Sequence, residues 1–258
     1  MTEARTTLRI ATYNIHKCRG LDRRVQPARI ASVLREVRAD VIGLQEVLSL
    51  EGGRPDQDQA RFLADALGME MQFSAVRDHR GARYGNLVLS ALPLGLGCSY
   101  DLSVGRREER GCLRADVGLG DGAWLHVFNV HLGTAHGERR QQGPRLVEAV
   151  LRESDRLTGP RVVLGDFNEW TVGLASRLLA SHFRAVDLRR HLGRSRTYPG
   201  VLPFLHLDHI YYDEGLELKA LALHRTRTAL VASDHLPLVA DFEVRPSARA
   251  RAKPATDS

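Results

Sequence analysis

Residues 161–170 (RVVLGDFNEW) constrain the fold and chemistry of this chain more than any other stretch. The stretch begins with the apolar run Val-Val-Leu, which predicts a buried strand, although periodicity alone does not distinguish it from a helix segment. Gly165 then ends the strand and lets the backbone turn closely. Asp166 and Asn168 alternate after it, so both can project to one side of the strand end. Such a pair can hold a water or a metal next to a phosphate; the alternative interpretation is a simple turn.

Polar residues follow other predicted strands in the same way. Strands are expected at residues 8–13, 40–44, 123–130 and 238–244, and Asp208 lies inside an apolar strand at 205–212, where an unpaired carboxylate would be unfavourable. The polar residues at or near strand ends are Asn14, Glu46, His131, Asp166, Asn168, Asp208 and the pair Asp234 and His235. Because sites in mixed α/β folds collect at strand ends and their loops, we expect one site here.

The residue types in this set indicate which metal they would bind. They are hard oxygen ligands and imidazoles, and the sequence contains no thiolate in a usable pattern. Carboxylate, amide and water ligands suit Mg²⁺ or Mn²⁺, whereas a zinc site usually brings more His or Cys. The predicted cofactor is therefore Mg²⁺ (or Mn²⁺). A divalent ion, an imidazole and a carboxylate able to hold a water are sufficient parts for phosphoester hydrolysis.

The sequence pattern of the other segments predicts helices and strands with no linker between domains. Helices are expected from Pro27 to Val37 and at residues 59–67, 138–151 and 172–179, and further strands at 69–76, 84–90, 93–104, 112–117 and 216–223. Residues 77–83 are predicted to be an exposed loop, and 106–110 (RREER) a solvated turn. We expect a short extension at 1–7, a single domain at 8–245 and a disordered basic tail at 246–258.

Composition favours an anionic partner and a reducing compartment. The net charge is +6 and the pI about 9.6, which suits nucleic acid, phospholipid headgroups or small phosphoesters. Lys accounts for only three of the 37 basic residues, so the Arg excess could instead reflect genome base composition. Three Cys without metal or disulfide spacing, no apolar signal region and no membrane-spanning run predict a cytoplasmic protein. Peripheral membrane contact through Arg-rich residues 187–196 stays open, and no obligate protein partner is evident.

Six short motifs occur in a familiar order along the chain. They are TYNIH, LQEV, NVHL, GDFN, LDHI and SDHLP, spread over residues 8–244. In this order they resemble the endonuclease/exonuclease/phosphatase superfamily, which includes DNase I, AP endonucleases, neutral sphingomyelinases and inositol polyphosphate 5-phosphatases. The opening of the chain is most similar to compact bacterial members. The resemblance implies an α/β fold of the DNase I-like type, a four-layer αββα sandwich with two mixed β-sheets packed face to face.

The resemblance also implies roles around a bound metal and an attacking water. Glu46 is the principal metal ligand, with Asn14 and Asp234 beside it. Asp166 orients or deprotonates the water, helped by Asn168. The implied reaction is in-line attack of water on phosphorus, in a phosphodiester or a phosphomonoester.

The remaining matched residues face the phosphate. His235 contacts it and is held by Asp208, a carboxylate–imidazole pair that favours the protonated ring. His131 matches a histidine that DNase I and sphingomyelinases carry, and Arg110 matches an Arg that some members place near the phosphate. His235→Ala is accordingly expected to lower activity.

The sequence departs from the AP endonuclease pattern at two positions. His16 stands where Asp is expected, and His131 stands where Tyr is expected. AP-site cleavage is therefore disfavoured, while nucleic acid, phospholipid and small phosphoesters all stay open as substrates. The alternative is a non-catalytic member that binds a phosphorylated ligand or a membrane surface through the same cleft.

Overall fold

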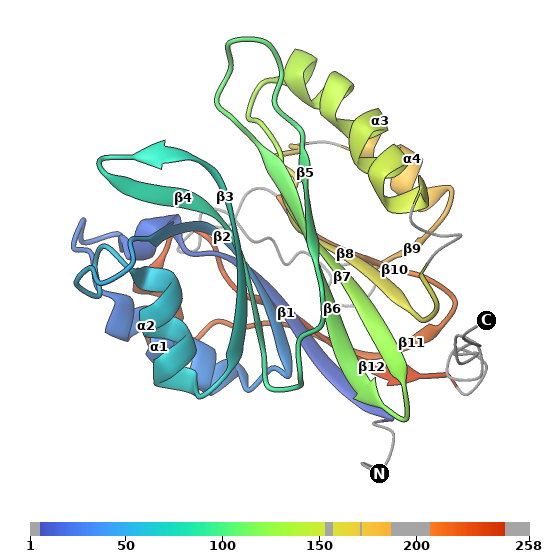
Figure 1. Ribbon diagram of the computed structural model, residues 1–258, viewed down its shortest axis with the longest axis horizontal. Coiled ribbons are helices and arrows are strands. Elements are labelled where there is room, and N and C mark those ends of the chain that lie inside the picture. The colour runs from blue at the N-terminus through green and yellow to red at the C-terminus, as the bar shows by residue number, and fades with distance from the viewer. Residues whose placement is uncertain (1–5, 153–156, 171, 187–206, 246–258) are drawn as a thin grey trace, which may run out of the picture.

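Two six-stranded mixed sheets form the centre of the computed structural model, which describes residues 6–152, 157–170, 172–186 and 207–245 (Figure 1). The first sheet has the order β11-β12-β1-β2-β4-β3, with β11 Leu216–Leu223, β12 Leu238–Val244, β1 Thr7–Asn14, β2 Val41–Ser49, β4 Ala82–Ser90 and β3 Glu70–His79. The second has the order β5-β6-β7-β8-β10-β9, with β5 Cys98–Asp101, β6 Gly111–Gly120, β7 Ala123–His131, β8 Arg161–Asp166, β10 Asp208–Tyr212 and β9 Arg184–Ala185.

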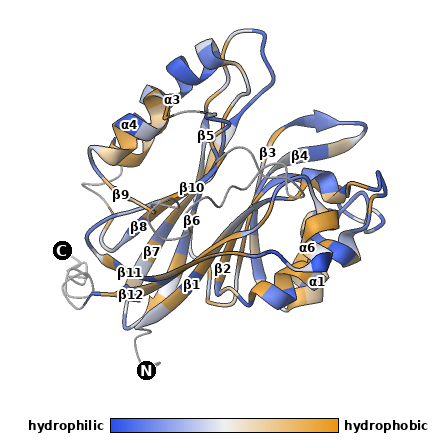
Figure 2. Cartoon of the chain, turned by 180° about the vertical axis from the view of Figure 1, so that it is seen from behind, coloured by the Kyte–Doolittle hydropathy of each residue, from blue (hydrophilic) through white to orange (hydrophobic). Residues whose placement is uncertain are grey.

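Helices cover the outer face of each sheet. The helices on the first sheet are α1 Pro27–Val37, α2 Gln59–Leu67 and α6 Arg227–Ala232, and those on the second are α3 His136–Arg152 and α4 Leu174–Ala180 (Figure 2). Between the sheets lies a core of aliphatic side chains from both, among them Ile10, Val41, Leu113, Val127 and Leu164. The predicted four-layer αββα sandwich is thus confirmed. Among the described residues, every helix is too short or too polar to cross a membrane.

Parallel strand pairs bring the polar strand ends to one edge. β1 runs parallel to β2 with Asn14 opposite Gln45, and β7 runs parallel to β8 with His131 opposite Asp166. Each pair is joined through a helix, α1 or α3, as a parallel connection requires. Since parallel strands end at the same edge of a sheet, each pair places polar residues at one edge of its own sheet.

Two glycines let the chain make close approaches that position this edge. Gly165 precedes Asp166 with φ 141°, and a Cβ there would clash with the carbonyl oxygen of Val130 in β7. Gly143 lies inside α3, and a Cβ there would contact the backbone of Ala175 in α4 at 3.0 Å. The Gly-Pro step at 143–144 therefore lies within a continuous helix that packs closely on α4.

Several local predictions need correction. Residues 77–83 were expected to be a loop, but β3 and β4 continue through them to a turn at Arg80 and Gly81, because the two strands pair with each other as far as His79 and Ala82. Of residues 93–104, only Cys98–Asp101 forms a strand. Helix α6 was not predicted, and the Arg-rich segment 187–196 and the basic tail lie outside the described residues.

Candidate active site

Asp166 occupies the centre of the polar edge. It ends β8, and its side chain is almost fully buried. Its Oδ2 accepts a hydrogen bond from Asn14 Nδ2 at 3.0 Å and lies 3.6 Å from the Nε2 atoms of both His131 and His235. Its Oδ1 accepts from the backbone N–H of Asn168 at 2.9 Å. Residues from both sheets therefore converge on one carboxylate.

The next residue in line is His235, whose ring is fixed from behind by Asp208. His235 Nδ1 donates to Asp208 Oδ2 at 2.9 Å, and both side chains are buried. Burial opposes the charge on the imidazole, but Asp208 and then Asp166 outweigh it and raise the pKa of His235 to about 10. The ring is therefore an imidazolium at neutral pH, the form that the family resemblance implies, and Nε2 lies 3.6 Å from Asp166 Oδ2.

The surroundings of Asp166 favour its neutral form, whereas those of His235 favour its charged form. Burial raises the pKa of Asp166, and the negative charge of Asp208, its partner across the β8–β10 register, raises it further. His235, Asn14 and the N–H of Asn168 lower it, and the balance is a pKa of about 6. The carboxylate is therefore ionised at neutral pH yet much more basic than an ordinary Asp, which suits a group that takes a proton from water.

Glu46 reaches the site through an irregularity in β2. The register of β2 against β4 shifts between Leu44 and Val47, and Glu46 there adopts a positive φ of 58°. Its Oε1 accepts from Asn14 Nδ2 at 3.2 Å and its Oε2 is ion-paired with Lys17 Nζ. Burial opposes ionisation, but the ion pair with the Lys17 ammonium outweighs it and holds the pKa of Glu46 below its ordinary value.

Asn14 links the two carboxylates. Its Nδ2 donates to both Glu46 and Asp166, while its Oδ1 accepts from the backbone N–H of His16 at 3.0 Å. The amide therefore holds the candidate metal ligand and the candidate base at a fixed separation. Its backbone carbonyl in turn accepts from Ser233 Oγ at 2.8 Å, which ties β1 to the loop that carries His235.

The predicted turn at 106–110 hides a buried cation. Arg110 is only 5% exposed, and its Nη1 lies 3.0 Å from His131 Nδ1. The same Nη1 lies 3.4 Å from Nε2, so Nδ1 is the closer of the two ring nitrogens. Because Arg can only donate, we assign Nδ1 as the acceptor and the proton of the neutral ring to Nε2, which lies 3.6 Å from Asp166 Oδ2. Burial and then the charge of Arg110 hold the pKa of His131 well below its ordinary value. His131 is therefore a neutral donor, in contrast to His235.

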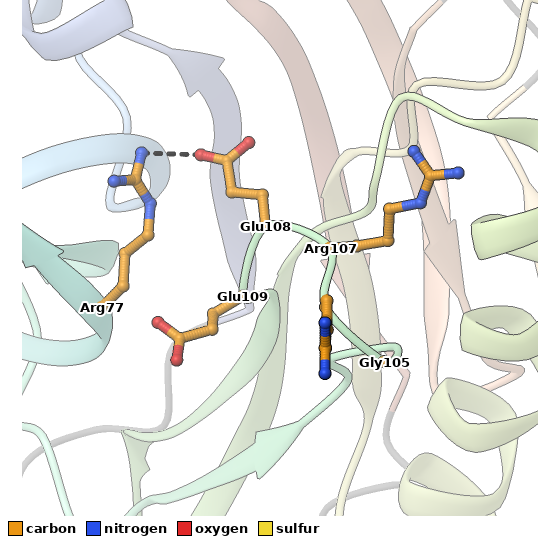
Figure 3. A pocket seen from close by; sticks show the side chains of 6 residues that line it. Arg77, Gly105, Arg107, Glu108 and Glu109 are labelled. Carbon is orange, nitrogen blue, oxygen red and sulfur yellow. Dashed lines mark hydrogen bonds and ion pairs between the residues drawn. The ribbon is translucent and has the colours of Figure 1, made fainter.

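Arg110 is held in turn by the rim of a surface cavity. Glu108 accepts from Arg110 at 2.7 Å and from Arg77 at 2.6 Å, so one carboxylate joins the two guanidinium groups. Figure 3 shows the Arg77 guanidinium joined to the Glu108 carboxylate at this cavity, which has a volume of about 570 Å³ and is lined by Arg77 and residues 105–109.

Two predicted residues have other immediate contacts than those expected. Asn168, at φ 50°, donates through Nδ2 to the carbonyl of Leu132 at 2.9 Å, so it reaches Asp166 through its backbone N–H. Asp234 accepts from Ser233 Oγ at 3.2 Å and lies 3.5 Å from His16 Nδ1, with 27% of its side chain exposed.

Sequence reasoning missed Lys17 and a polar layer beneath the site. Lys17 carried no signal beyond lying three residues after Asn14. Gln45 Nε2 donates to Asn129 Oδ1 at 2.7 Å between the sheets, and Asn129 donates to the carbonyls of Leu44 and Leu87 at 2.9 Å each. The alternation of polar and apolar residues around NVHL and LQEV could have indicated this layer, which supports the site from within the sandwich.

The donors fit a hard divalent cation with few protein ligands. Among the described residues, no three His, Cys, Asp or Glu side chains gather closely enough to hold a metal by themselves. Glu46 is ionised, has 17% of its side chain exposed and is flanked by the amide of Asn14. Mg²⁺ commonly binds one or two carboxylates and keeps several waters, so this donor set suits Mg²⁺ or Mn²⁺ and does not suit zinc.

The chain is similar to known proteins in sequence and in structure. Residues 11–235 match the model of the Endonuclease/Exonuclease/phosphatase family. The uncharacterized protein YbhP of Escherichia coli K12 is 31% identical over 248 residues, covering 92% of this chain and 97% of YbhP. An endonuclease/exonuclease/phosphatase from Beutenbergia cavernae superimposes with a TM-score of 0.72 at 24% identity, covering 93% of this chain and 72% of that one.

A more distant structure shares the same fold. The catalytic domain of human Nocturnin, solved with a bound sulfate, has a TM-score of 0.72 at 19% identity and covers 95% of this chain and 97% of that one. At these identities the structures establish the fold, while the family match spans most of the chain and includes all nine predicted site residues. The chain belongs to the Endonuclease/Exonuclease/phosphatase family.

Proposed function

We propose that this protein is a divalent-metal-dependent phosphoesterase that hydrolyses a phosphoester bond by in-line attack of water at phosphorus. The observation that carries the proposal is the pair of contacts at Asp166 Oδ2, where a protonated His235 and a neutral His131 both approach to 3.6 Å. A basic carboxylate between two imidazoles of different charge can accept a proton from water while the imidazoles face the phosphate.

Asp166 is proposed to orient and deprotonate the attacking water. Its pKa of about 6 keeps it ionised at neutral pH and leaves it basic enough to take a proton as the water attacks. Asn168 assists by donating its backbone N–H to the other carboxylate oxygen, which fixes the direction of the free lone pairs.

Charge that develops on the phosphate is proposed to be stabilised by three side chains. His235 is held protonated and in one ring orientation by Asp208, so it can donate from Nε2 to a phosphate oxygen or to the leaving oxygen. His131 donates as a neutral ring whose tautomer is set by Arg110. Arg110 adds a permanent positive charge nearby.

Glu46 is proposed as the principal ligand of Mg²⁺ or Mn²⁺, with Asn14 and Asp234 beside it. The ion, when bound, would supply Lewis-acid stabilisation of negative charge on the phosphate oxygens. Asn14 contributes from the protein side by holding Glu46 and Asp166 together through one amide. Asp234 is partly exposed to solvent. The hydroxyl of Ser233 contacts both Asp234 Oδ1 and the backbone carbonyl of Asn14, so Asp234 lies near the end of β1.

The substrate class is tested by a panel assay. Wild-type protein is incubated with Mg²⁺ or Mn²⁺ and bis-p-nitrophenyl phosphate, p-nitrophenyl phosphate, plasmid DNA, sphingomyelin or cardiolipin, each beside an Asp166→Ala control. Hydrolysis that EDTA and the substitution both abolish supports the proposal, and the preferred compound identifies nucleic acid, phospholipid or small phosphoester. Metal binding by a folded protein without hydrolysis of any compound would favour the non-catalytic alternative.

Two further predictions concern where the protein acts. The cytoplasmic location rests on cysteines without disulfide spacing, and all three, Cys18, Cys98 and Cys112, are unpaired thiols. Peripheral membrane contact through residues 187–196 stays a prediction, and salt-sensitive binding to anionic liposomes would support it. Binding that is indifferent to anionic lipid would count against it.

A further inference from the structure

Lys17 lies in an unusual backbone segment directly after β1. His16, Lys17 and Cys18 have consecutive φ angles of 46°, 57° and 56°, all in the left-handed region, although none of them is glycine. Three such residues in a row are unfavourable and persist only where the surroundings fix them. Backbone strain of this kind clusters at functional sites.

The contacts that fix this turn surround Lys17. The carbonyl of Lys17 accepts from Gln59 Nε2 at 2.8 Å, and the carbonyl of Cys18 accepts from the N–H of Gln26 at 2.9 Å. The side chain of Cys18 is fully buried against the outer face of the first sheet. The backbone of Lys17 is thus anchored to α2 and to the start of α1, and its position is not adjustable.

The side chain of Lys17 extends from this anchor to the candidate metal ligand. Its Nζ is ion-paired with Glu46 Oε2 and lies 5.6 Å from the centre of the Tyr84 ring. The other oxygen of Glu46 already accepts from Asn14. Each oxygen of Glu46 therefore already has a partner, and a divalent cation that binds Oε2 has to compete with the ammonium. The Lys17 side chain is 25% exposed, so solvent offers it a path away.

We propose that Lys17 is a tethered counter-cation of the metal site, and that its ammonium and the divalent cation exchange places at Glu46. The inference rests on the proposed function, because it requires Glu46 to bind the metal. Before metal arrives, the ammonium keeps Glu46 from being an uncompensated carboxylate in a mostly buried position. After the exchange, the fixed backbone keeps the ammonium beside the site, where it binds a phosphate oxygen of the substrate.

The proposal predicts that removing the Lys17 charge increases the affinity of the protein for the divalent cation. Removing a residue that merely supports the site would weaken metal binding or leave it unchanged. Removing a competing cation strengthens it, because the metal no longer displaces the ammonium from Glu46. For one partly exposed ion pair we expect about tenfold tighter binding, which corresponds to about 1.4 kcal/mol.

Mn²⁺ binding, followed by the electron paramagnetic resonance signal of the free ion, tests this without any reaction. Lys17→Met and Lys17→Asn both remove the charge, and Asn also tolerates the left-handed backbone. Both variants are expected to bind Mn²⁺ about tenfold more tightly than wild type, and Glu46→Gln to lose most binding. Lys219→Met is the matched control, because Lys219 pairs with Glu217 and Glu243 on the first sheet and should leave the affinity unchanged.

Steady-state kinetics test whether the displaced ammonium binds the phosphate of the substrate. At saturating Mn²⁺, the Lys17 variants are expected to raise KM for bis-p-nitrophenyl phosphate about tenfold with little change in kcat. Equal or weaker Mn²⁺ affinity in both folded Lys17 variants, with wild type active, would overturn this inference and leave the proposed function standing. Absence of Mn²⁺ binding and of hydrolysis in wild type and variants alike would instead reject the proposed function and this inference with it.

Discussion

Replacing Asp166 by Asn is expected to abolish hydrolysis and at the same time to stabilise the metal-free fold. Burial and the neighbouring Asp208 raise the pKa of Asp166 from 3.8 to about 6, so the folded protein at pH 8 carries a carboxylate whose surroundings favour the neutral form. A rise of this size corresponds to about 3 kcal/mol of lost stability above the folded pKa. Asn has nearly the same shape as Asp and never ionises.

Part of this gain is offset by hydrogen bonding. Asp166 accepts from the amide of Asn14 and from the N–H of Asn168, and the substitution replaces one of the two accepting oxygens by an amide nitrogen, which donates. The resulting mismatch costs about 1 kcal/mol. The net expectation is about 2 kcal/mol of added stability, or a rise in Tm of about 6 °C for a domain of this size.

The pH dependence distinguishes this explanation from a general packing effect. The carboxylic acid of Asp166 favours folding below its unfolded pKa of 3.8, and this contribution is lost as pH rises through about 6. Asp166→Asn should therefore unfold at a higher temperature than wild type at pH 8 in EDTA, and this advantage should disappear by pH 4. The variant should also lose about a thousandfold in kcat with metal present. A variant less stable than wild type at pH 8, or equally more stable at pH 4 and pH 8, would refute the reasoning.

Three other perturbations test separate parts of the site. The rate of hydrolysis by wild type should rise as Asp166 loses its proton near pH 6 and fall as His235 loses its proton near pH 10. In the same pH–rate series, His235→Gln should show no fall at alkaline pH, and its kcat should be about a hundredfold lower. Arg110→Gln should raise the pKa of His131 toward, but not to, its ordinary value, since burial remains; an unchanged NMR titration of that ring would contradict the assignment. Gly165→Ala should destabilise the fold by about 3 kcal/mol in urea unfolding, because the added Cβ meets a β7 carbonyl, and a change below about 1 kcal/mol would show that the strand can yield.

The sequence predicted the strand ends well because they carry a local signal. A short apolar run followed by Gly, Asp and Asn predicts a strand end from the local sequence alone. The structure places Asp166 at the end of β8, as that pattern indicates. The pairing of Asp208 with His235 was predicted from the family order of the motifs, and their 2.9 Å contact agrees with it. Periodicity alone would have shown only an apolar strand interrupted by an acid.

Three residues have surroundings that the sequence did not predict. Arg110 ends a charge run that was predicted to be a solvated turn, although the family resemblance placed it near the phosphate. It is buried, with its Nη1 and Nη2 against His131 and Glu108. Arg77 looked like part of a loop, but it stacks on the ring of Tyr84 at 4.3 Å within a strand pair. Lys17 lies in a left-handed turn that contains no Gly, so nothing in the sequence indicated the turn. Such contacts exist only after the fold has formed.

The most direct test of the account is hydrolysis of bis-p-nitrophenyl phosphate with Mn²⁺ in water enriched in ¹⁸O, using wild type and Asp166→Ala side by side. Attack of water on phosphorus predicts metal-dependent turnover by wild type, one ¹⁸O in the p-nitrophenyl phosphate product and none in p-nitrophenol. Turnover that persists in Asp166→Ala, label recovered in the phenol, or no metal-dependent turnover by folded wild type would contradict the account.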